Sequence, residues 1–225
     1  MREDRAKAIQ KKTIGDYEEI VEEFSVSRDK HPFFWPEFLD IKQLITPHQK
    51  ILDIGCGNGR FFEAIKDLQP EYYGVDPSQK LLNIAGERYG NKANFKKGDF
   101  LKLPFGDNFF DTAVAIASFH HIPSQDWRRL ALREASRVLK EGGLFVLTVW
   151  NLWQPKYEKY IVKDPKQAQE KNLDIGDSLI PWRHQVDRYY HAFTREELEA
   201  LLKGEFKILT LKETDFNFLA VVSKS

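Results

Sequence analysis

The stretch from Ile51 to Arg60 reads Ile-Leu-Asp-Ile-Gly-Cys-Gly-Asn-Gly-Arg, and it decides the fold of this chain. Its apolar start predicts a buried strand over residues 50–54, and a helix is expected from Arg60. Asp53 places a carboxylate at the end of that strand. The glycines that follow at alternate positions are Gly55, Gly57 and Gly59. Glycine permits a tight turn and a close approach of a ligand to the backbone, so this loop is the first candidate binding site.

The chain beyond this loop alternates strand and helix patterns, which predicts an α/β fold. Strands are expected near residues 51–54, 72–75, 93–95, 113–117, 144–149, 206–211 and 216–222. Helices are expected near residues 60–68, 78–88, 126–139 and 194–203. Ser124 is expected to cap the third of these helices, and Thr194 to cap the last. The order predicts a doubly wound, Rossmann-like sheet of seven strands, mostly parallel with an antiparallel last strand.

We expect residues 1–225 to form one domain in four parts. Residues 1–49 are expected to be a helical N-terminal cover, and residues 50–150 the binding core. Residues 151–193 include a long stretch without a clear period, which is typical of a lid or a substrate-binding insertion. Residues 194–225 supply the last helix and two strands.

Composition indicates a globular enzyme, and its neutral charge disfavours tight, unaided binding of nucleic acid without excluding RNA. The 225 residues are 42% apolar and 30% charged, and lysine plus arginine balance aspartate plus glutamate at 34 each. Proteins that bind nucleic acid unaided usually carry a basic excess, so we expect no DNA partner. No apolar run approaches the ~20 residues of a membrane span. The single cysteine, Cys56, excludes an internal disulfide and favours the cytoplasm.

Acidic residues follow the next two predicted strands, where ligands of doubly wound sheets bind. Asp76 follows the second strand, and its carboxylate could accept hydrogen bonds from both hydroxyls of a ribose. Asp99 follows the third strand and could accept a hydrogen bond from an adenine amino group, with Phe100 as an apolar or stacking surface. Together with Asp53, these acids predict a nucleoside-containing ligand across the strand ends.

The glycine loop with its leading acid resembles the nucleotide loop of the class I methyltransferases. Phe110–Ala117 resembles their fourth strand, and Arg137–Gly143 resembles the turn into their fifth strand. The resemblance covers about residues 48–150 and implies S-adenosylmethionine as cofactor, with S-adenosylhomocysteine as product. It also implies that the backbone near Ala117 faces the methionine end of the cofactor.

Several further segments resemble one family, the tRNA methyltransferases that esterify 5-carboxymethyluridine at the wobble position. These segments are Phe24–Arg28, Ile116–His121, Val149–Trp150, Leu179–Trp182 and Arg188–Phe193. The insertion between the last two segments is much shorter here than in that family. The resemblance implies a tRNA substrate, and members of the family can work with a small zinc-binding partner subunit. In this chain itself we predict no metal site.

The residue types suit a carboxylate acceptor. A carboxylate is ionised at pH 7 and needs no general base, so the enzyme has to orient it and exclude water. Arg28 and His121 are the predicted catalytic cations, and the resemblance implies the same two positions. The other predicted substrate-binding residues are His120, Trp150, Trp182, Arg188, Tyr190 and His191. Of the His120–His121 pair, at most one side chain is expected to face the substrate, because neighbours in an extended segment diverge. Trp182, Trp150 or Tyr189 could stack on a flipped base.

Two other classes of function stay open at this point. The first is a small-molecule methyltransferase of the same fold, acting on a carboxylic acid, a phenol or an amine. The second is a non-catalytic module that binds the cofactor or RNA. The neutral charge and the shared core motifs support a small-molecule methyltransferase.

Overall fold

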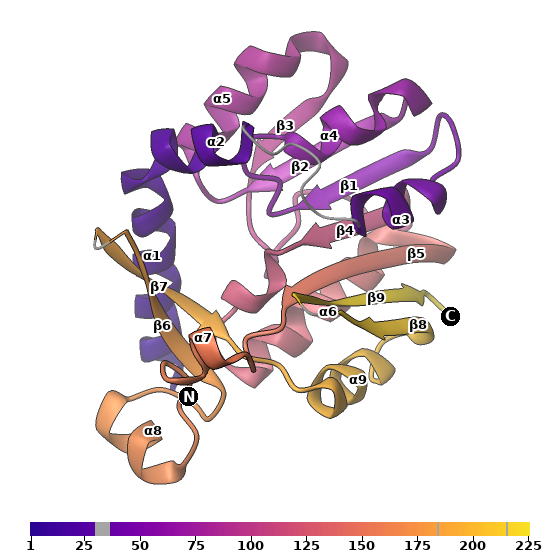
Figure 1. Cartoon of the computed structure of the whole chain (residues 1–225). Helices are drawn as coiled ribbons and strands as arrows, with labels where there is room; N and C mark the ends of the chain where they lie inside the picture. Colours follow the sequence, from indigo (N-terminus) through magenta and orange to yellow (C-terminus); the bar gives the residue numbers. More distant parts are fainter. Residues whose placement is uncertain (30–36, 184, 215) are drawn as a thin grey trace.

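A seven-stranded sheet forms the centre of the computed structural model, which describes residues 1–29, 37–183, 185–214 and 216–225 (Figure 1). Its strands are β1 (Lys50–Ile54), β2 (Glu71–Asp76), β3 (Asn94–Lys97), β4 (Phe110–Ile116), β5 (Leu139–Trp150), β8 (Lys207–Glu213) and β9 (Asn217–Ser223). They lie in the order β3-β2-β1-β4-β5-β9-β8. β1 to β5 are parallel, and β9 is antiparallel to both of its neighbours. The predicted doubly wound, Rossmann-like fold is confirmed.

Helices cover both faces of the sheet, because successive side chains of a buried strand point to opposite sides. Ile51 packs in the cluster that includes α3 (Glu37–Gln43) and α4 (Arg60–Ile65). Its neighbour Leu52 packs in the cluster that includes α6 (Gln125–Val138) and α9 (Arg195–Lys203). α5 (Gln79–Tyr89) lies against β3 at the edge of the sheet (Figure 1). Short 3-10 turns are η1 (Lys66–Leu68), η2 (Gly90–Lys92) and η3 (Phe119–His121).

The helix caps expected from the sequence are present. The Ser124 hydroxyl accepts a hydrogen bond from the Trp127 N–H, and the Thr194 hydroxyl accepts one from the Glu197 N–H. The sequence placed the fifth strand at 144–149, after a glycine pair, but β5 already begins at Leu139. The glycines therefore lie inside the strand span, where the pairing register between β4 and β5 shifts.

The N-terminal helices and the segment after β5 form a second layer over the carboxyl ends of the parallel strands. The helices are α1 (Glu3–Glu19), α2 (Val21–Asp29), α7 (Pro155–Glu158) and α8 (Pro165–Lys171). β6 (Asp177–Trp182) and β7 (Val186–His191) form a separate antiparallel hairpin that the sequence did not predict. α1 runs beside β7 (Figure 1), and the Lys12 ammonium donates a hydrogen bond to the Asp187 carbonyl at 2.9 Å. Within the described residues, no helix combines the length and apolarity that a membrane span requires.

Candidate active site

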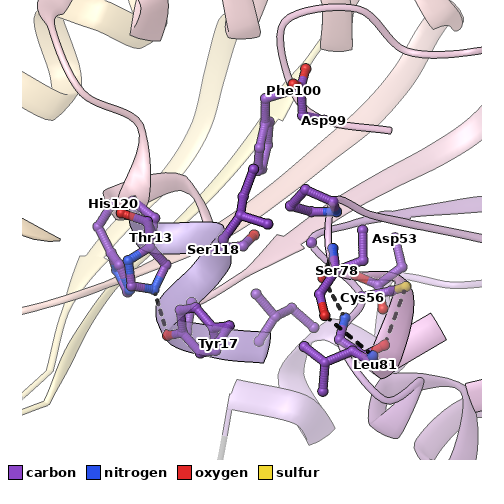
Figure 2. Close-up of a pocket in the computed structure, with 18 of the residues that line it drawn as sticks. Thr13, Tyr17, Asp53, Cys56, Ser78, Leu81, Asp99, Phe100, Ser118 and His120 are labelled. Atoms are coloured by element: carbon purple, nitrogen blue, oxygen red, sulfur yellow. Dashed lines mark hydrogen bonds between the residues drawn. The ribbon is translucent and has the colours of Figure 1, made fainter. Parts of the chain in front are cut away.

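One pocket joins the ends of β1, β2 and β4 to the second layer. Figure 2 shows its two sides: Asp53, Cys56 and Ser78 lie on one, while Thr13, Tyr17 and His120 lie on the other. Its wall contains most of the predicted site residues, namely Arg28, Asp53, Gly55, Gly57, Asp76, Asp99, Phe100, Ala117, His120, His121, Trp150 and Tyr190. The fold therefore brings residues from seven separate segments of the chain around one cavity.

The glycine loop takes the backbone shape that its sequence requires. Gly55, Gly57 and Gly59 have φ angles of 77°, 56° and 76°, in the left-handed region that glycine adopts without strain. The N–H groups of Gly55 and Cys56 both donate to the Val75 carbonyl, at 2.7 and 3.1 Å. A Cβ on Gly55 would lie only 2.4 Å from the Ser118 Cβ, whereas one on Gly57 would meet nothing closer than 3.9 Å. Gly55 is thus needed for packing, and Gly57 presents bare backbone to the pocket.

Asp76 ends β2 and faces this loop. One carboxylate oxygen accepts the Gly57 N–H at 2.8 Å, and the other accepts the Ser78 N–H at 2.9 Å. Each carboxylate oxygen has two lone pairs, so one on each remains for a ligand hydroxyl. Burial raises the pKa of Asp76 to about 6, although the two backbone donors oppose that shift.

Asp53 lies deeper than Asp76, with 2% of its surface exposed. Its carboxylate accepts a hydrogen bond from the Tyr72 hydroxyl at 2.5 Å. Burial, with a smaller contribution from the negative charge of Asp76, raises the pKa of Asp53 to about 7. The adjacent Cys56 thiol has a pKa raised well above its ordinary value by burial, so this cysteine is not an activated nucleophile.

Asp99 and Phe100 follow the end of β3 and line the pocket. Asp99 accepts hydrogen bonds from the Leu101 N–H at 2.8 Å and from the Gln10 amide at 3.1 Å. Phe100 packs edge-on against Phe119, with 5.9 Å between the ring centres. The two side chains thus present a carboxylate and an aromatic ring to the cavity, as a purine would require.

Ala117 follows β4 with a φ of 50°, which is unusual for a residue other than glycine. Its N–H donates to both the carbonyl and the hydroxyl of Thr148, each at 3.0 Å. The next residue, Ser118, donates its hydroxyl to the Ile54 carbonyl at 2.7 Å. These bonds to the two neighbouring strands hold the strained turn in place at the floor of the pocket.

Arg28, in the last turn of α2, also lines the cavity. Its guanidinium carbon lies 4.9 Å from the centre of the Phe24 ring. Burial lowers the pKa of Arg28, and the positive charge of Arg188 adds to this lowering. The predicted cation is therefore in position at the pocket, and it shares its surroundings with a second arginine.

His121 also lines the pocket, but it is a neutral ring. Its Nδ1 donates to the Tyr189 carbonyl at 2.7 Å, because a carbonyl can only accept. Its Nε2 then accepts the hydrogen bond of the Tyr17 hydroxyl at 2.9 Å. Burial lowers the pKa of His121 to about 3. The cationic role that we predicted for His121 is corrected accordingly, and the ring acts here as a hydrogen-bond acceptor.

The prediction that the adjacent histidines diverge was wrong. They lie in η3 rather than in an extended segment, so their rings stay close, with centres 4.6 Å apart. Both rings line the pocket. The Nδ1 of His120 accepts the Trp150 N–H at 3.1 Å, which leaves its proton on Nε2.

Arg188 and Trp182 are not among the lining residues, but Arg188 packs against the lining residues Tyr17 and Tyr190. The Arg188 guanidinium lies 4.4 Å from the centre of the Trp182 ring and donates to the Tyr17 hydroxyl at 3.1 Å. Trp150 stacks on Tyr190, with ring centres 5.1 Å apart. In this arrangement the two indoles pack on other side chains, so the predicted stacking on a base is not favoured.

Tyr189 and His191 point away from the pocket, which corrects their predicted contact with a substrate. The His191 ring lies between two carboxylates, 2.8 Å from Asp177 and 2.8 Å from Glu197. The Tyr189 hydroxyl donates to the same Asp177 oxygen at 2.7 Å. This buried network joins the β6–β7 hairpin to α9, so these two side chains have a structural role.

Sequence reasoning missed the part of the wall that comes from α1. Gln10, Thr13, Ile14 and Tyr17 all line the pocket. Their spacing of three and four residues places them on one face of a helix, and that spacing is the signal that could have identified them.

The residues present fit an adenosyl cofactor. Asp76 offers two acceptor positions, and Asn58, in the glycine loop, has a buried amide nitrogen with no hydrogen-bond partner among the described residues. Bare backbone at Gly57 allows a close approach. The described part of the chain contains no cluster of three or more histidine, cysteine or acidic side chains that could hold a metal ion.

Known proteins are similar to this chain in sequence and in fold. Residues 52–147 match the family described as methyltransferase domain. A protein of Encephalitozoon cuniculi described as a methyltransferase is 34% identical, over 92% of this chain and 93% of its own length. The tRNA (carboxymethyluridine(34)-5-O)-methyltransferase of Xenopus tropicalis is 28% identical over 82% of this chain, which spans 36% of that relative. A cycloartenol-C-24-methyltransferase of Arabidopsis thaliana is 30% identical over 84% of this chain and 52% of its own length. Among solved structures, a SAM-dependent methyltransferase of Methanosarcina mazei matches with a TM-score of 0.72 and 25% identity, over 84% of this chain and 97% of that one.

Proposed function

The chain belongs to the S-adenosylmethionine-dependent methyltransferases, and from this premise we propose that it esterifies the carboxylate of 5-carboxymethyluridine at the tRNA wobble position. The observation that carries the proposal is the composition of the pocket described above. Its wall combines the glycine loop and the acids of a nucleoside site with Arg28, which packs on an aromatic ring. A guanidinium in a buried, aromatic-lined compartment is the group that recognises a carboxylate on a planar substrate.

The cofactor would be held by four segments of the chain. Asp76 would accept the ribose hydroxyls, Asp99 the adenine amino group, and the loop at Gly57 would pass beside the ligand. Phe100 would line the adenine, and Ala117 the methionine end. When bound, S-adenosylmethionine supplies a methyl group on a positively charged sulfur, which is an electrophile.

The acceptor end has to orient an anion and exclude water. A carboxylate is already ionised at neutral pH, so no side chain has to remove a proton from it. Arg28 would hold it through charge-assisted hydrogen bonds. The neutral His121 cannot compete for that charge, and its bond to Tyr17 fixes the neighbouring wall. Orientation and dehydration of two bound reactants can supply much of the rate of such a transfer.

The relatives support this acceptor without identifying it. The Xenopus relative carries the proposed activity in its name, and the match covers most of this chain. This chain spans only about a third of that relative, so the activity, substrate and partners of the whole relative are transferred here as proposals. Within that proposal, residues 151–193 act as the acceptor-side cover, and a small zinc-binding partner subunit could add the basic surface that the neutral chain lacks.

A transfer assay tests the proposal. Purified protein with tritium-labelled S-adenosylmethionine is offered tRNA that contains 5-carboxymethyluridine, and separately a metabolite extract. We expect label in the tRNA that mild alkali releases as volatile methanol, because only an ester methyl is so labile. Arg28→Ala should abolish this label and leave the affinity for S-adenosylhomocysteine unchanged. Label that resists alkali, or that appears only in the extract, would refute the tRNA proposal.

A small-molecule methyltransferase is the second candidate function. It is favoured by the balanced charge of 34 basic and 34 acidic residues and by the similarity to a cycloartenol-C-24-methyltransferase. Label confined to the metabolite extract in the same assay would support this candidate.

A further inference from the structure

Four buried polar atoms around the acceptor end have no hydrogen-bond partner among the described residues. They are His120 Nε2, Trp182 Nε1, Arg188 Nε and the Tyr190 hydroxyl. Native structures leave few such atoms unpaired, because each unpaired buried polar group costs about 1–3 kcal/mol. A group of four in one place therefore points to a ligand.

The four side chains are in contact with one another. The Arg188 guanidinium carbon lies 4.4 Å from the centre of the Trp182 ring and 5.2 Å from that of Tyr190. The Tyr190 ring centre lies 5.1 Å from that of His120. His120 and Tyr190 also line the pocket, so the cluster reaches the acceptor compartment.

All four atoms can donate a hydrogen bond. The guanidinium and indole nitrogens are donors only, and a tyrosine hydroxyl can donate. His120 Nε2 carries the ring proton, because Nδ1 accepts the Trp150 N–H. The cluster is thus a donor set around one positive charge.

That charge belongs to Arg188, which is 3% exposed. Its one hydrogen-bond partner among the described residues is the Tyr17 hydroxyl, and none of the described carboxylates forms an ion pair with it. A buried cation without a counter-ion is costly, and an anion placed beside it offsets that cost. A carboxylate has two oxygens with about four lone pairs, which matches four donors. An amine would bring N–H groups and a positive charge to the same place, and a phenol would bring one neutral oxygen.

We propose that His120, Trp182, Arg188 and Tyr190 form an acceptor-anion subsite that binds carboxylates and rejects amines and phenols. Arg188 supplies the charge, and Tyr17 is a positioning residue that joins Arg188 to His121. This inference rests on the proposed function, since it takes a carboxylate as the acceptor of the methyl group. It adds which residues recognise the negative charge of the acceptor. It also restricts the substrates of the small-molecule alternative to carboxylic acids.

A binding experiment tests the subsite without any turnover. The probes are an anticodon stem-loop RNA with 5-carboxymethyluridine and the same RNA with the neutral 5-carbamoylmethyluridine, each in the presence of S-adenosylhomocysteine. We expect fluorescence anisotropy to show about 10- to 100-fold tighter binding of the carboxylate form, the usual range for a buried charged hydrogen bond. Arg188→Met should strongly reduce this preference, and Arg28 then remains as the second cation at the pocket. Equal binding of the two RNAs by the unaltered protein would overturn the subsite.

Two further variants keep the result interpretable. Arg183→Met is the matched control, because Arg183 lies over the same Trp182 ring at 5.6 Å but has a side chain that is 61% exposed. It should keep the full preference. If Arg188→Met does not fold, Tyr190→Phe removes one donor and keeps the ring, and it should reduce the preference several-fold. A full preference in a folded Arg188→Met or in Tyr190→Phe would overturn the subsite.

A small-molecule arm separates this inference from the tRNA proposal. Methyl transfer to phenylacetate is compared with transfer to phenethylamine and to phenol. Transfer to phenylacetate that needs Arg188 would support the subsite even if the RNA is not methylated. Comparable transfer to the amine or the phenol would refute the subsite, whichever result the RNA gives.

Discussion

Cofactor affinity should fall tenfold when the pH drops from 7 to 5, because Asp76 takes up a proton in that interval. Burial raises the pKa of Asp76 to about 6, so the carboxylate is about 90% ionised at pH 7 and about 10% ionised at pH 5. Only the ionised form keeps all of its acceptor positions for the ribose hydroxyls beside the bonds from Gly57 and Ser78. If only that form binds, the loss is about 10-fold in affinity, or about 1.4 kcal/mol.

Calorimetric titration with S-adenosylhomocysteine at pH 5, 6, 7 and 8 measures this effect, with circular dichroism to confirm that the protein stays folded. Asp76→Asn should bind weakly at every pH and show no such dependence. Asp53, with its pKa raised to about 7, would add a further loss of about 50-fold if its charge were also required. A loss of about 10-fold between pH 7 and pH 5 therefore assigns the effect to Asp76 alone, and a loss of about 500-fold assigns it to both carboxylates. An affinity that is the same at pH 5 and pH 7 would refute the reasoning.

Three further predictions concern other parts of the site. Asp53→Asn should stabilise the cofactor-free protein by up to about 4 kcal/mol at pH 8 and by little near pH 4. The reason is that the pKa of Asp53 is raised to about 7, so ionisation of this buried carboxyl destabilises the native protein as the pH rises toward that value. Thermal melts at the two pH values measure the effect, and an equal stabilisation at both would contradict the prediction. Tyr17→Phe removes the hydroxyl between Arg188 and His121, and it should lower kcat/KM about 3- to 10-fold with unchanged affinity for S-adenosylhomocysteine. His121→Ala should lower kcat/KM further, again with unchanged cofactor affinity. Steady-state kinetics and calorimetry test both variants, and equal losses in turnover and cofactor affinity would mean a purely structural role. His191→Ala should lower the free energy of unfolding in urea by about 3 kcal/mol, because it breaks a buried network with two carboxylates. The KM for the acceptor should stay the same. A raised KM in a stable variant would show instead that His191 takes part in substrate binding.

The cofactor half of the site followed from the sequence because its signals are local. The glycine loop, Asp76 and Asp99 each follow directly from a predicted strand, and parallel strands of a doubly wound sheet present those ends at one edge. The spacing along the chain therefore already implied their arrangement in space. The same locality made the caps at Ser124 and Thr194 predictable.

The acceptor half depends on contacts between distant segments, which periodicity does not encode. The β6–β7 hairpin was not predicted, and its pairing decides that Tyr190 faces the pocket while His191 faces Asp177. The turn at η3 brought the two histidines together where an extended segment would have separated them.

The sequence by itself determined that this chain folds as a doubly wound methyltransferase sheet with a nucleoside site at the tips of its first strands. Only the tertiary structure decided the charge and the role of the acceptor-side residues. Tyr17 meets His121 across 104 residues and Arg188 across 171 residues of sequence. The burial that makes this histidine neutral, and that encloses the arginine among aromatic rings, exists only once those segments pack together.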